Sequence, residues 1–238
     1  MRAQLNRLIV AVGLLVALPV VAVVGRVNRR AGRRVAVRAV KTITRACGIR
    51  IEVRGADRIQ DDGAYVLVPN HTSPFDIAAV LVARPDAQFV AAAGLFRIPL
   101  LGSAMRAIGT VPIKRNDHDS ARERVAELSQ HADDRELVVF AEGGIAPGPD
   151  LLPFKTGAFV IAIGSGVPVV PIAISGASSV LPREGHLLVR PGAVTIELLP
   201  PVPTDGLTVD DRHTLADRVR TVIVESLSRR TTAEVPVA

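Results

Sequence analysis

The feature that most constrains this chain is an uncharged apolar run near its N-terminus. Leu8 to Val24 is seventeen residues without a charge, and Arg7 and Arg26 bracket it. A run of this length is at the lower edge of what crosses a bilayer as a helix. A secretory signal peptide looks similar, but an arginine-rich stretch follows in place of a small-x-small cleavage site. The run therefore predicts a membrane anchor, and Pro19 leaves open whether it spans the bilayer or bends into a shallow hairpin with the next helix.

The basic charge of the chain is concentrated in the same segment. Residues 1–54 carry twelve Lys or Arg against one acid, Glu52, so this part has a net charge of +11 and the remainder a net charge of −5. No recognition helix, zinc spacing or aromatic platform accompanies the charge, which argues against a nucleic-acid partner. An anionic membrane surface is the better match. If the run spans, the heavier basic load after it predicts a domain on the cytoplasmic side.

Val27 to Cys47 predicts a basic amphipathic helix that ends at Gly48. Its apolar residues recur every four positions while arginines occupy the other faces. Such a helix suits a lipid headgroup layer, although a solvated helix packed on the domain has the same pattern. Cys47 is the single cysteine, which excludes an internal disulfide and suits a reducing compartment. The apolar positions are Val27, Ala31, Val35, Ala39, Ile43 and Cys47.

From residue 48 onward the sequence predicts an α/β domain, with a mixed sheet flanked by helices. Along the chain, helical stretches alternate with short runs that are typical of strands, either continuously apolar or with apolar and polar residues in alternation. Prolines in the 167–174 run predict an edge strand or a bulge. We expect a membrane anchor and basic helix at 1–47, the domain at 48–230 and a tail at 231–238. Strands are expected at 49–53, 65–68, 88–92, 109–115, 137–141, 167–174 and 194–198, a charged surface helix at 120–131, and a last helix at 208–227 that Thr208 and Asp211 open as a capping box.

The most informative stretch is Asn70-His71-Thr72-Ser73-Pro74-Phe75-Asp76, which joins an expected strand to an expected helix. Ser73, Pro74 and Asp76 match a capping box, so one interpretation is that this stretch does no more than start a helix. Alternatively, Asp76 holds one ring nitrogen of His71 while the other takes a proton from a hydroxyl. Such a base needs no serine or cysteine nucleophile and indicates transfer of a group onto an alcohol. The spacing alone leaves both interpretations open.

Three further stretches carry groups suited to a polar ligand. Arg115 ends a short strand, where an arginine either grips a phosphate with its planar fork or is simply solvated. Glu142 and Gly143 follow a buried strand, where the carboxylate either orders a cation or a substrate hydroxyl or sits on a tight turn. Lys155 lies in Phe154-Lys155-Thr156-Gly157-Ala158-Phe159, just before an apolar helix.

Taken in order, these stretches resemble the motifs of the glycerolipid acyltransferase family, whose best-known members acylate lysophosphatidic acid. The resemblance covers most of residues 48–205. Residues 70–76 resemble the first motif, His-x4-Asp, the stretch ending in Arg115 the second, residues 140–143 the third and residues 167–171 the fourth. The third motif departs from the family, because Ala141, Gly144, Ile145 and Ala146 stand where proline, threonine, arginine and serine are expected. That arginine is thought to help hold the acceptor's phosphate, and Ala93 stands where a lysine commonly lies.

The resemblance implies an O-acyltransferase without a metal or a further cofactor. His71 would be the general base, oriented by Asp76, and would deprotonate the free hydroxyl of a lysophospholipid, above all 1-acyl-sn-glycerol-3-phosphate. The hydroxyl would attack an acyl-coenzyme A or acyl carrier protein thioester and give phosphatidic acid. The alternatives are a catalytically silent lipid-binding protein and a membrane-bound lipid hydrolase in which His71 activates water. The residues expected to bind the substrate are Asn70, Ser73, Arg115, Glu142, Gly143 and Lys155.

Overall fold

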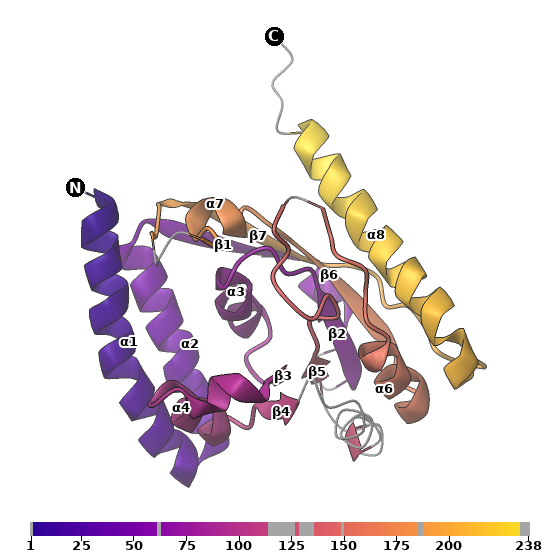
Figure 1. The fold of residues 1–238 in the computed structure, drawn as a ribbon, viewed down its shortest axis with the longest axis horizontal. Helices are drawn as coiled ribbons and strands as arrows, with labels where there is room; N and C mark the ends of the chain where they lie inside the picture. The colour runs from indigo at the N-terminus through magenta and orange to yellow at the C-terminus, as the bar shows by residue number, and fades with distance from the viewer. Residues whose placement is uncertain are drawn as a thin grey trace.

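A central sheet with helices on both faces forms the body of the protein (Figure 1). The computed structural model describes residues 2–60, 63–113, 127–128, 136–148, 150–184 and 188–233. In Figure 1, α1 and α2 lie side by side on one side of the sheet with α3 next to them, and α6 and α8 lie on the other side. The helices are α1 (Arg2–Val27), α2 (Arg29–Ala46), α3 (Phe75–Ala83), α4 (Leu101–Ala107), α6 (Gly157–Ser165), α7 (Ala177–Val180) and α8 (Arg212–Ala233).

Seven strands form the sheet in the order β1-β7-β6-β2-β5-β3-β4. Neighbouring strands are parallel except β6 and β7, which are antiparallel, so the sheet is mixed as predicted. The strands are β1 (Ile49–Arg54), β2 (Tyr65–Pro69), β3 (Gln88–Ala92), β4 (Val111–Ile113), β5 (Glu136–Val138), β6 (Val169–Ser175) and β7 (Gly192–Leu198).

The central strand β2 contributes to a core on each face of the sheet. Leu67 packs in the core that α3 covers, whereas Val66 and Val68 pack in the core that α6 and α8 cover. All three side chains are fully buried. This double burial explains why the run is continuously apolar and does not alternate. It also fixes the end of β2, from which the histidine stretch emerges.

Strand β6 lies inside the sheet, between β2 and β7, so the prediction of an edge strand is wrong. A bulge does occur opposite Pro171, which has no N–H to donate, but it lies in the facing segment and not in β6 itself. Ile172 pairs with Leu198 while Val169 pairs with Val202, so the facing chain has one more residue than β6 over this interval. The extra residue interrupts the ladder beside the proline, and a proline is therefore tolerated in a central strand.

Helix α1 is continuous through Pro19, and the hairpin with α2 forms at Asn28. Asn28 caps α2, because its side-chain oxygen accepts the Ala31 N–H at 3.0 Å. The helix is long and apolar enough to reach across a membrane, and only 11% of its most apolar window is buried in the protein. The kink expected at Pro19 is therefore not the cause of the hairpin.

The buried face of α2 differs from the predicted stripe. Val27 belongs to α1 and is 88% exposed, and Val35 and Ala39 are only half-buried. A strict four-residue step drifts by about 40° per step around a helix of 3.6 residues per turn, so such a stripe cannot follow one face. The core-facing residues instead mix steps of three and four, so α2 packs on the domain through this face. They are Gly32, Ala36, Val37, Val40, Ile43, Thr44 and Cys47.

Helix α1 is fastened to the rest of the protein at both ends. Near its start, the buried Asn6 donates its side-chain amide to the carbonyls of Cys47 at 3.1 Å and Val189 at 3.2 Å. Near its end, Gly25 touches α4, because a Cβ at Gly25 would lie 2.9 Å from the Ala107 Cβ. Both contacts join α1 to the same α/β body.

The capping box at the last helix is confirmed, with the Thr208 N–H bonded to Asp211 at 2.8 Å. Helix α8 continues to Ala233, past the predicted end at residue 227. The helix predicted at 120–131 lies almost entirely outside the described residues.

Candidate active site

The site forms where β2 and β5 end side by side. These strands are parallel neighbours, but the helices that follow them cover opposite faces, since α3 packs in one core and α6 in the other. Connections that leave adjacent strands toward opposite faces open a crevice at the carboxyl ends of the strands. His71 lies two residues beyond β2, and Glu142 lies four residues beyond β5. Topology therefore brings the first and third motifs to the same edge of the sheet, where such a crevice is expected.

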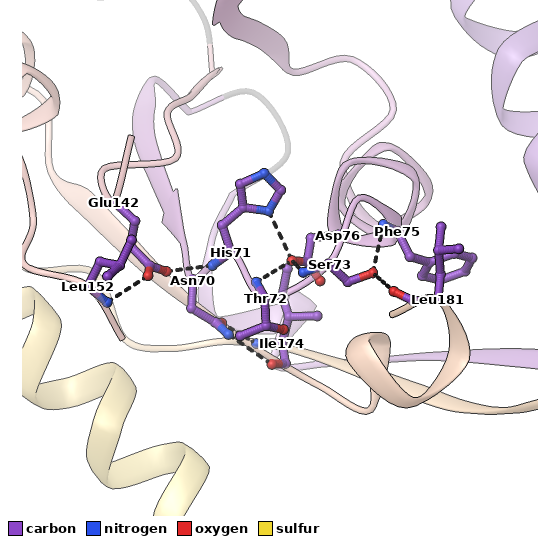
Figure 2. A network of polar contacts seen from close by, with 10 residues as sticks. All are labelled: Asn70, His71, Thr72, Ser73, Phe75, Asp76, Glu142, Leu152, Ile174 and Leu181. Atoms are coloured by element: carbon purple, nitrogen blue, oxygen red, sulfur yellow. Dashed lines mark hydrogen bonds and ion pairs between the residues drawn. The ribbon is translucent and has the colours of Figure 1, made fainter. Parts of the chain in front are cut away.

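His71 and Asp76 are in direct contact, as the second interpretation of the stretch requires. The His71 Nδ1 lies 3.0 Å from Asp76 Oδ2, and Figure 2 shows the other ring nitrogen pointing away from the carboxylate. The histidine is 7% exposed and the aspartate is fully buried. The Phe140 ring packs against the imidazole with 4.2 Å between centroids. The imidazole is thus held on two sides, and its Nε2 remains available to a ligand.

The same Asp76 oxygen also holds the loop that leads into the helix, so a structural role for this stretch is compatible with the histidine contact. Oδ2 accepts the backbone N–H groups of Thr72 and Ser73, both at 2.8 Å. The helix begins at Phe75, and Pro74 is its N-cap residue. The contacts with Thr72 and Ser73 fix the carboxylate that orients the histidine.

The other oxygen of Asp76, Oδ1, is buried and has no hydrogen-bond partner among the described residues. All three polar contacts of this carboxylate are made by Oδ2, with the Thr72 and Ser73 N–H groups and the His71 ring. They fix the carboxylate beside the imidazole, where an acid can orient the ring and face a positive charge that develops on it during a reaction. This arrangement favours a histidine that takes up a proton during a reaction.

Glu142 is buried and uses both carboxylate oxygens on backbone groups. Oε1 accepts the His71 N–H at 2.6 Å and Oε2 accepts the Leu152 N–H at 2.8 Å (Figure 2). Burial raises the pKa of Glu142, although the two backbone hydrogen bonds act in the opposite direction. The geometry favours a role in positioning the His71 main chain over direct contact with a substrate.

Asn70 and Ser73 are both fully buried and engaged within the protein. The Asn70 amide exchanges two hydrogen bonds with the backbone of Ile174 on β6, at 2.7 and 3.0 Å. Ser73 Oγ accepts the Phe75 N–H at 3.0 Å and donates to the Leu181 carbonyl at 2.6 Å. These bonds tie the histidine loop to two distant segments. These contacts favour a positioning role for both residues, and the substrate contact expected from the sequence remains a prediction.

Gly143 and Lys155 lie against each other in the turn after Glu142. Gly143 has a φ of +71°, and a Cβ there would lie 2.7 Å from Lys155 Cε, so both conformation and space favour glycine. Lys155 is exposed and brings a cation to a turn in which Ile145 stands in place of the family's arginine. Arg115, the other expected phosphate contact, lies outside the described residues.

Sequence reasoning missed the backbone partners that hold the site together. The Ala146 N–H bonds to the His71 carbonyl at 2.8 Å, and Leu152 and Leu181 supply the contacts given above. No side-chain pattern marks these residues, because each acts through its main chain. In the described parts of the chain, no three His, Cys, Asp or Glu side chains are grouped to hold a metal ion. Metal-free chemistry remains a prediction.

Comparisons with known proteins identify the class of this fold and site. Residues 50–175 match the acyltransferase family, and the chain belongs to that family. Its overall structure resembles the crystal structure of the 1-acyl-sn-glycerophosphate acyltransferase from Thermotoga maritima, with a TM-score of 0.77, 24% identity, and coverage of 97% of this chain and 98% of that one.

Two proteins with similar sequences are both named as 1-acyl-sn-glycerol-3-phosphate acyltransferases. The mouse 1-acyl-sn-glycerol-3-phosphate acyltransferase alpha is 35% identical over 73% of this chain. The Escherichia coli 1-acyl-sn-glycerol-3-phosphate acyltransferase is 29% identical over 76% of this chain and 74% of its own length. The chain spans 62% of the length of the mouse protein.

Proposed function

We propose that this protein transfers a fatty acyl group from an acyl thioester to the free hydroxyl of a lysophospholipid, most favourably 1-acyl-sn-glycerol-3-phosphate, which would give phosphatidic acid. The observation that carries the proposal is the pair of His71 Nδ1 and Asp76 Oδ2, 3.0 Å apart, at the carboxyl end of a central strand. The names of the similar mouse and Escherichia coli proteins support this acceptor.

In the proposed reaction, His71 Nε2 takes the proton of the acceptor hydroxyl while the hydroxyl oxygen attacks the thioester carbonyl carbon. Asp76 keeps the Nδ1 proton in place and stabilises the imidazolium that forms. The carbon–sulfur bond then breaks, and the leaving thiolate receives the proton from His71. An ester bond replaces the thioester bond, and the histidine returns to its starting state. Acyl-coenzyme A and acyl carrier protein are both chemically suitable donors.

The acceptor's phosphate would be held by cations other than the two that the family commonly uses. Ile145 and Ala93 are apolar at those positions. Lys155 lies against Gly143, and three residues further along the chain the Ala146 N–H bonds to the His71 carbonyl. Lys155, with Arg115, is therefore the proposed source of positive charge for the phosphate. A lysolipid with a different head group is the second acceptor to test.

We infer that α1 lies along one leaflet and does not span the bilayer. Asn6 at one end and Gly25 at the other both contact the α/β body. A spanning helix would place these ends about 30 Å apart on opposite sides of the bilayer core, where one body cannot reach both. The basic residues that follow support a cytoplasmic leaflet, which is rich in anionic lipid.

The membrane arrangement is tested by cysteine labelling in sealed vesicles. With Cys47→Ala as background, Gln4→Cys and Arg30→Cys should both react with a membrane-impermeant maleimide from the same side. Labelling of the two from opposite sides would contradict the one-leaflet arrangement.

The function is tested by acyl transfer in detergent-purified protein. Labelled acyl-coenzyme A and acyl carrier protein are offered with a panel of lysolipids to wild type and His71→Ala. Wild type should acylate one acceptor, and His71→Ala should acylate the same acceptor about a thousandfold more slowly. Equal lysolipid binding without transfer in both proteins would establish the silent lipid-binding alternative. Release of free fatty acid without an acceptor would establish a hydrolase.

A further inference from the structure

A cavity of about 470 Å³ lies where the turn between α1 and α2 meets α4. Arg26, Val27 and Arg29 line it from the turn, and Ser103 and Arg106 line it from α4. None of the residues that surround His71 takes part in its lining. It is therefore a second, separate site on the side of the protein that carries the apolar helix (Figure 1).

Close backbone contacts fix the shape of this cavity. A Cβ at Gly32 would lie 2.5 Å from the Gly25 Cα, so α1 and α2 cross with their backbones touching. Gly25 in turn meets Ala107 of α4, as described above. The three elements that carry the arginines are thus held together before any ligand arrives, which lowers the entropy cost of binding.

The cavity gathers positive charge without a compensating acid. The sequences of α1, α2 and α4 contain no Asp or Glu. Neither Arg26 nor Arg29 makes an ion pair among the described residues. Arg106 is held in place, because it donates to the Phe96 carbonyl at 2.9 Å and stacks over the Phe96 ring at 5.5 Å, which leaves most of its five N–H donors available. Guanidinium groups have the charge and the planar N–H geometry that bind a phosphate, and three of them surround this cavity.

The surface beside the cavity is apolar, which distinguishes a lipid phosphate from a soluble one. Val27 lines the cavity and is 88% exposed, and Val23 and Val20 continue the same exposed stripe at 66% and 43%. Leu100, which immediately precedes α4, is also exposed, at 40%, and has a φ of +62°. A γ-turn in which Leu101 N–H bonds to the Pro99 carbonyl at 2.7 Å keeps Leu100 in this strained conformation.

We propose that this cavity binds the phosphate of an anionic membrane lipid, with the acyl chains of that lipid against the exposed valines of α1. The bound lipid is a membrane component and not the acyl acceptor, so the proposal is independent of the reaction at His71. Its role is to hold the turn between α1 and α2 at the level of the lipid phosphates.

The test uses full-length protein in detergent, with thermal unfolding followed during titration with dihexanoyl-phosphatidylglycerol, dihexanoyl-phosphatidylcholine or inorganic phosphate. Wild type should show a saturable rise in Tm with the anionic lipid only. In the variant Arg26→Gln/Arg106→Gln, the apparent Kd for that lipid should rise by about tenfold or more. The loss of one charge-assisted hydrogen bond weakens binding by about this factor. The matched control Arg34→Gln/Arg38→Gln removes the same charge from exposed positions on α2 outside the cavity and should stay within about twofold of wild type.

Equal weakening in both double variants would overturn the proposal in favour of diffuse surface charge. Inorganic phosphate that saturates the site as tightly as the lipid would overturn the lipid assignment and leave a free-phosphate site. Ser103→Asp provides an independent variant, because it keeps all three arginines and places a carboxylate in the cavity. Unchanged lipid binding in Ser103→Asp would contradict the proposal, and loss of binding with an unaltered Tm of the free protein supports it.

Discussion

Glu142 holds the main chain of His71, with 2.6 Å between its Oε1 and the backbone nitrogen of the histidine. Asp76 holds the ring of the same residue through Nδ1 at 3.0 Å. Two buried carboxylates, Asp76 on α3 and Glu142 in the turn after β5, therefore contact the same histidine. Glu142 fixes its main chain, and Asp76 fixes the orientation of its ring. This division of work leads to separate expectations for the two acids.

Asp76→Asn should lower kcat by a factor of about a hundred to ten thousand and change KM by only a few-fold. The amide still accepts the Thr72 and Ser73 N–H groups, but its NH₂ cannot serve as the anionic partner of Nδ1, so the tautomer and the imidazolium lose their support. Steady-state transfer kinetics measure the effect. Asp86→Asn, which changes an exposed acid away from the crevice, is the control and should leave kcat unaltered. A normal kcat in Asp76→Asn would mean that the pair is only a helix cap.

Glu142→Gln should reduce kcat by about tenfold and the free energy of unfolding by about 1–3 kcal/mol, because one of two buried N–H groups loses its acceptor. The pH dependence gives a second readout. Burial raises the pKa of Glu142 in the folded protein above its ordinary value of 4.5. At pH values between the ordinary pKa and the raised pKa, the folded protein therefore binds more protons than the unfolded chain. Wild-type stability should accordingly fall as pH rises through this window.

Denaturant unfolding at several pH values measures this contribution of Glu142. The Gln variant should lack it, so its stability relative to wild type should improve as pH rises through the window. Glu225→Gln, at an exposed position on α8, is the control. An identical pH profile in wild type and Glu142→Gln would contradict the assignment.

Glu197→Gln should have the opposite pH signature. Burial alone would raise the pKa of Glu197, but hydrogen bonds from Arg230 at 2.8 Å, Ser226 at 2.9 Å and Arg58 at 3.2 Å outweigh it and hold the pKa below 4.5. The unfolded chain then takes up the proton first as pH falls, so the contribution to stability is present above 4.5 and is lost on acidification. The variant should lose stability at neutral pH and show a shallower acid slope than wild type. A steeper acid slope in the variant would refute this.

Val16→Lys/Val23→Lys should weaken binding to vesicles by a factor on the order of ten to a hundred, since each valine loses apolar burial in the lipid. Both side chains are exposed, at 61% and 66%, on the outer face of α1. Flotation with phosphatidylcholine vesicles measures the change. The control Val53→Lys/Val209→Lys alters two other exposed valines, at 36% and 46%, on the domain. Equal losses in both double variants would argue against α1 as the membrane contact.

Local features of the fold could be predicted from the sequence. The strand before Asn70, the strand at 88–92 and the capping box at Thr208 each depend on neighbouring residues, so periodicity and capping rules sufficed. The position of β6 could not be predicted, because whether a proline is tolerated depends on the bulge in a facing segment about thirty residues later. The face of α2 was predicted in part only, since its sequence does not show what packs against it.

The candidate site was predictable to the same extent. The contact of His71 with Asp76 spans five residues and follows from their spacing. The tasks of Asn70, Ser73 and Glu142 depend on Ile174, Leu181 and Leu152, which lie ten to over a hundred residues away and contribute only backbone groups. The backbone partners of these three residues therefore could not be predicted from the sequence, and the roles of all the site residues toward a substrate remain predictions.

The fastening of α1 at both ends affects where the proposed product can go. If α1 lies along one leaflet as proposed, its attachment through Asn6 and Gly25 would keep His71 at a fixed height above that lipid layer. Under this arrangement the protein would take its acceptor from that layer and return its product there. The opposite layer would then grow only as fast as lipid crosses the bilayer by other means, so the supply of new membrane on the two sides would be set by separate rates.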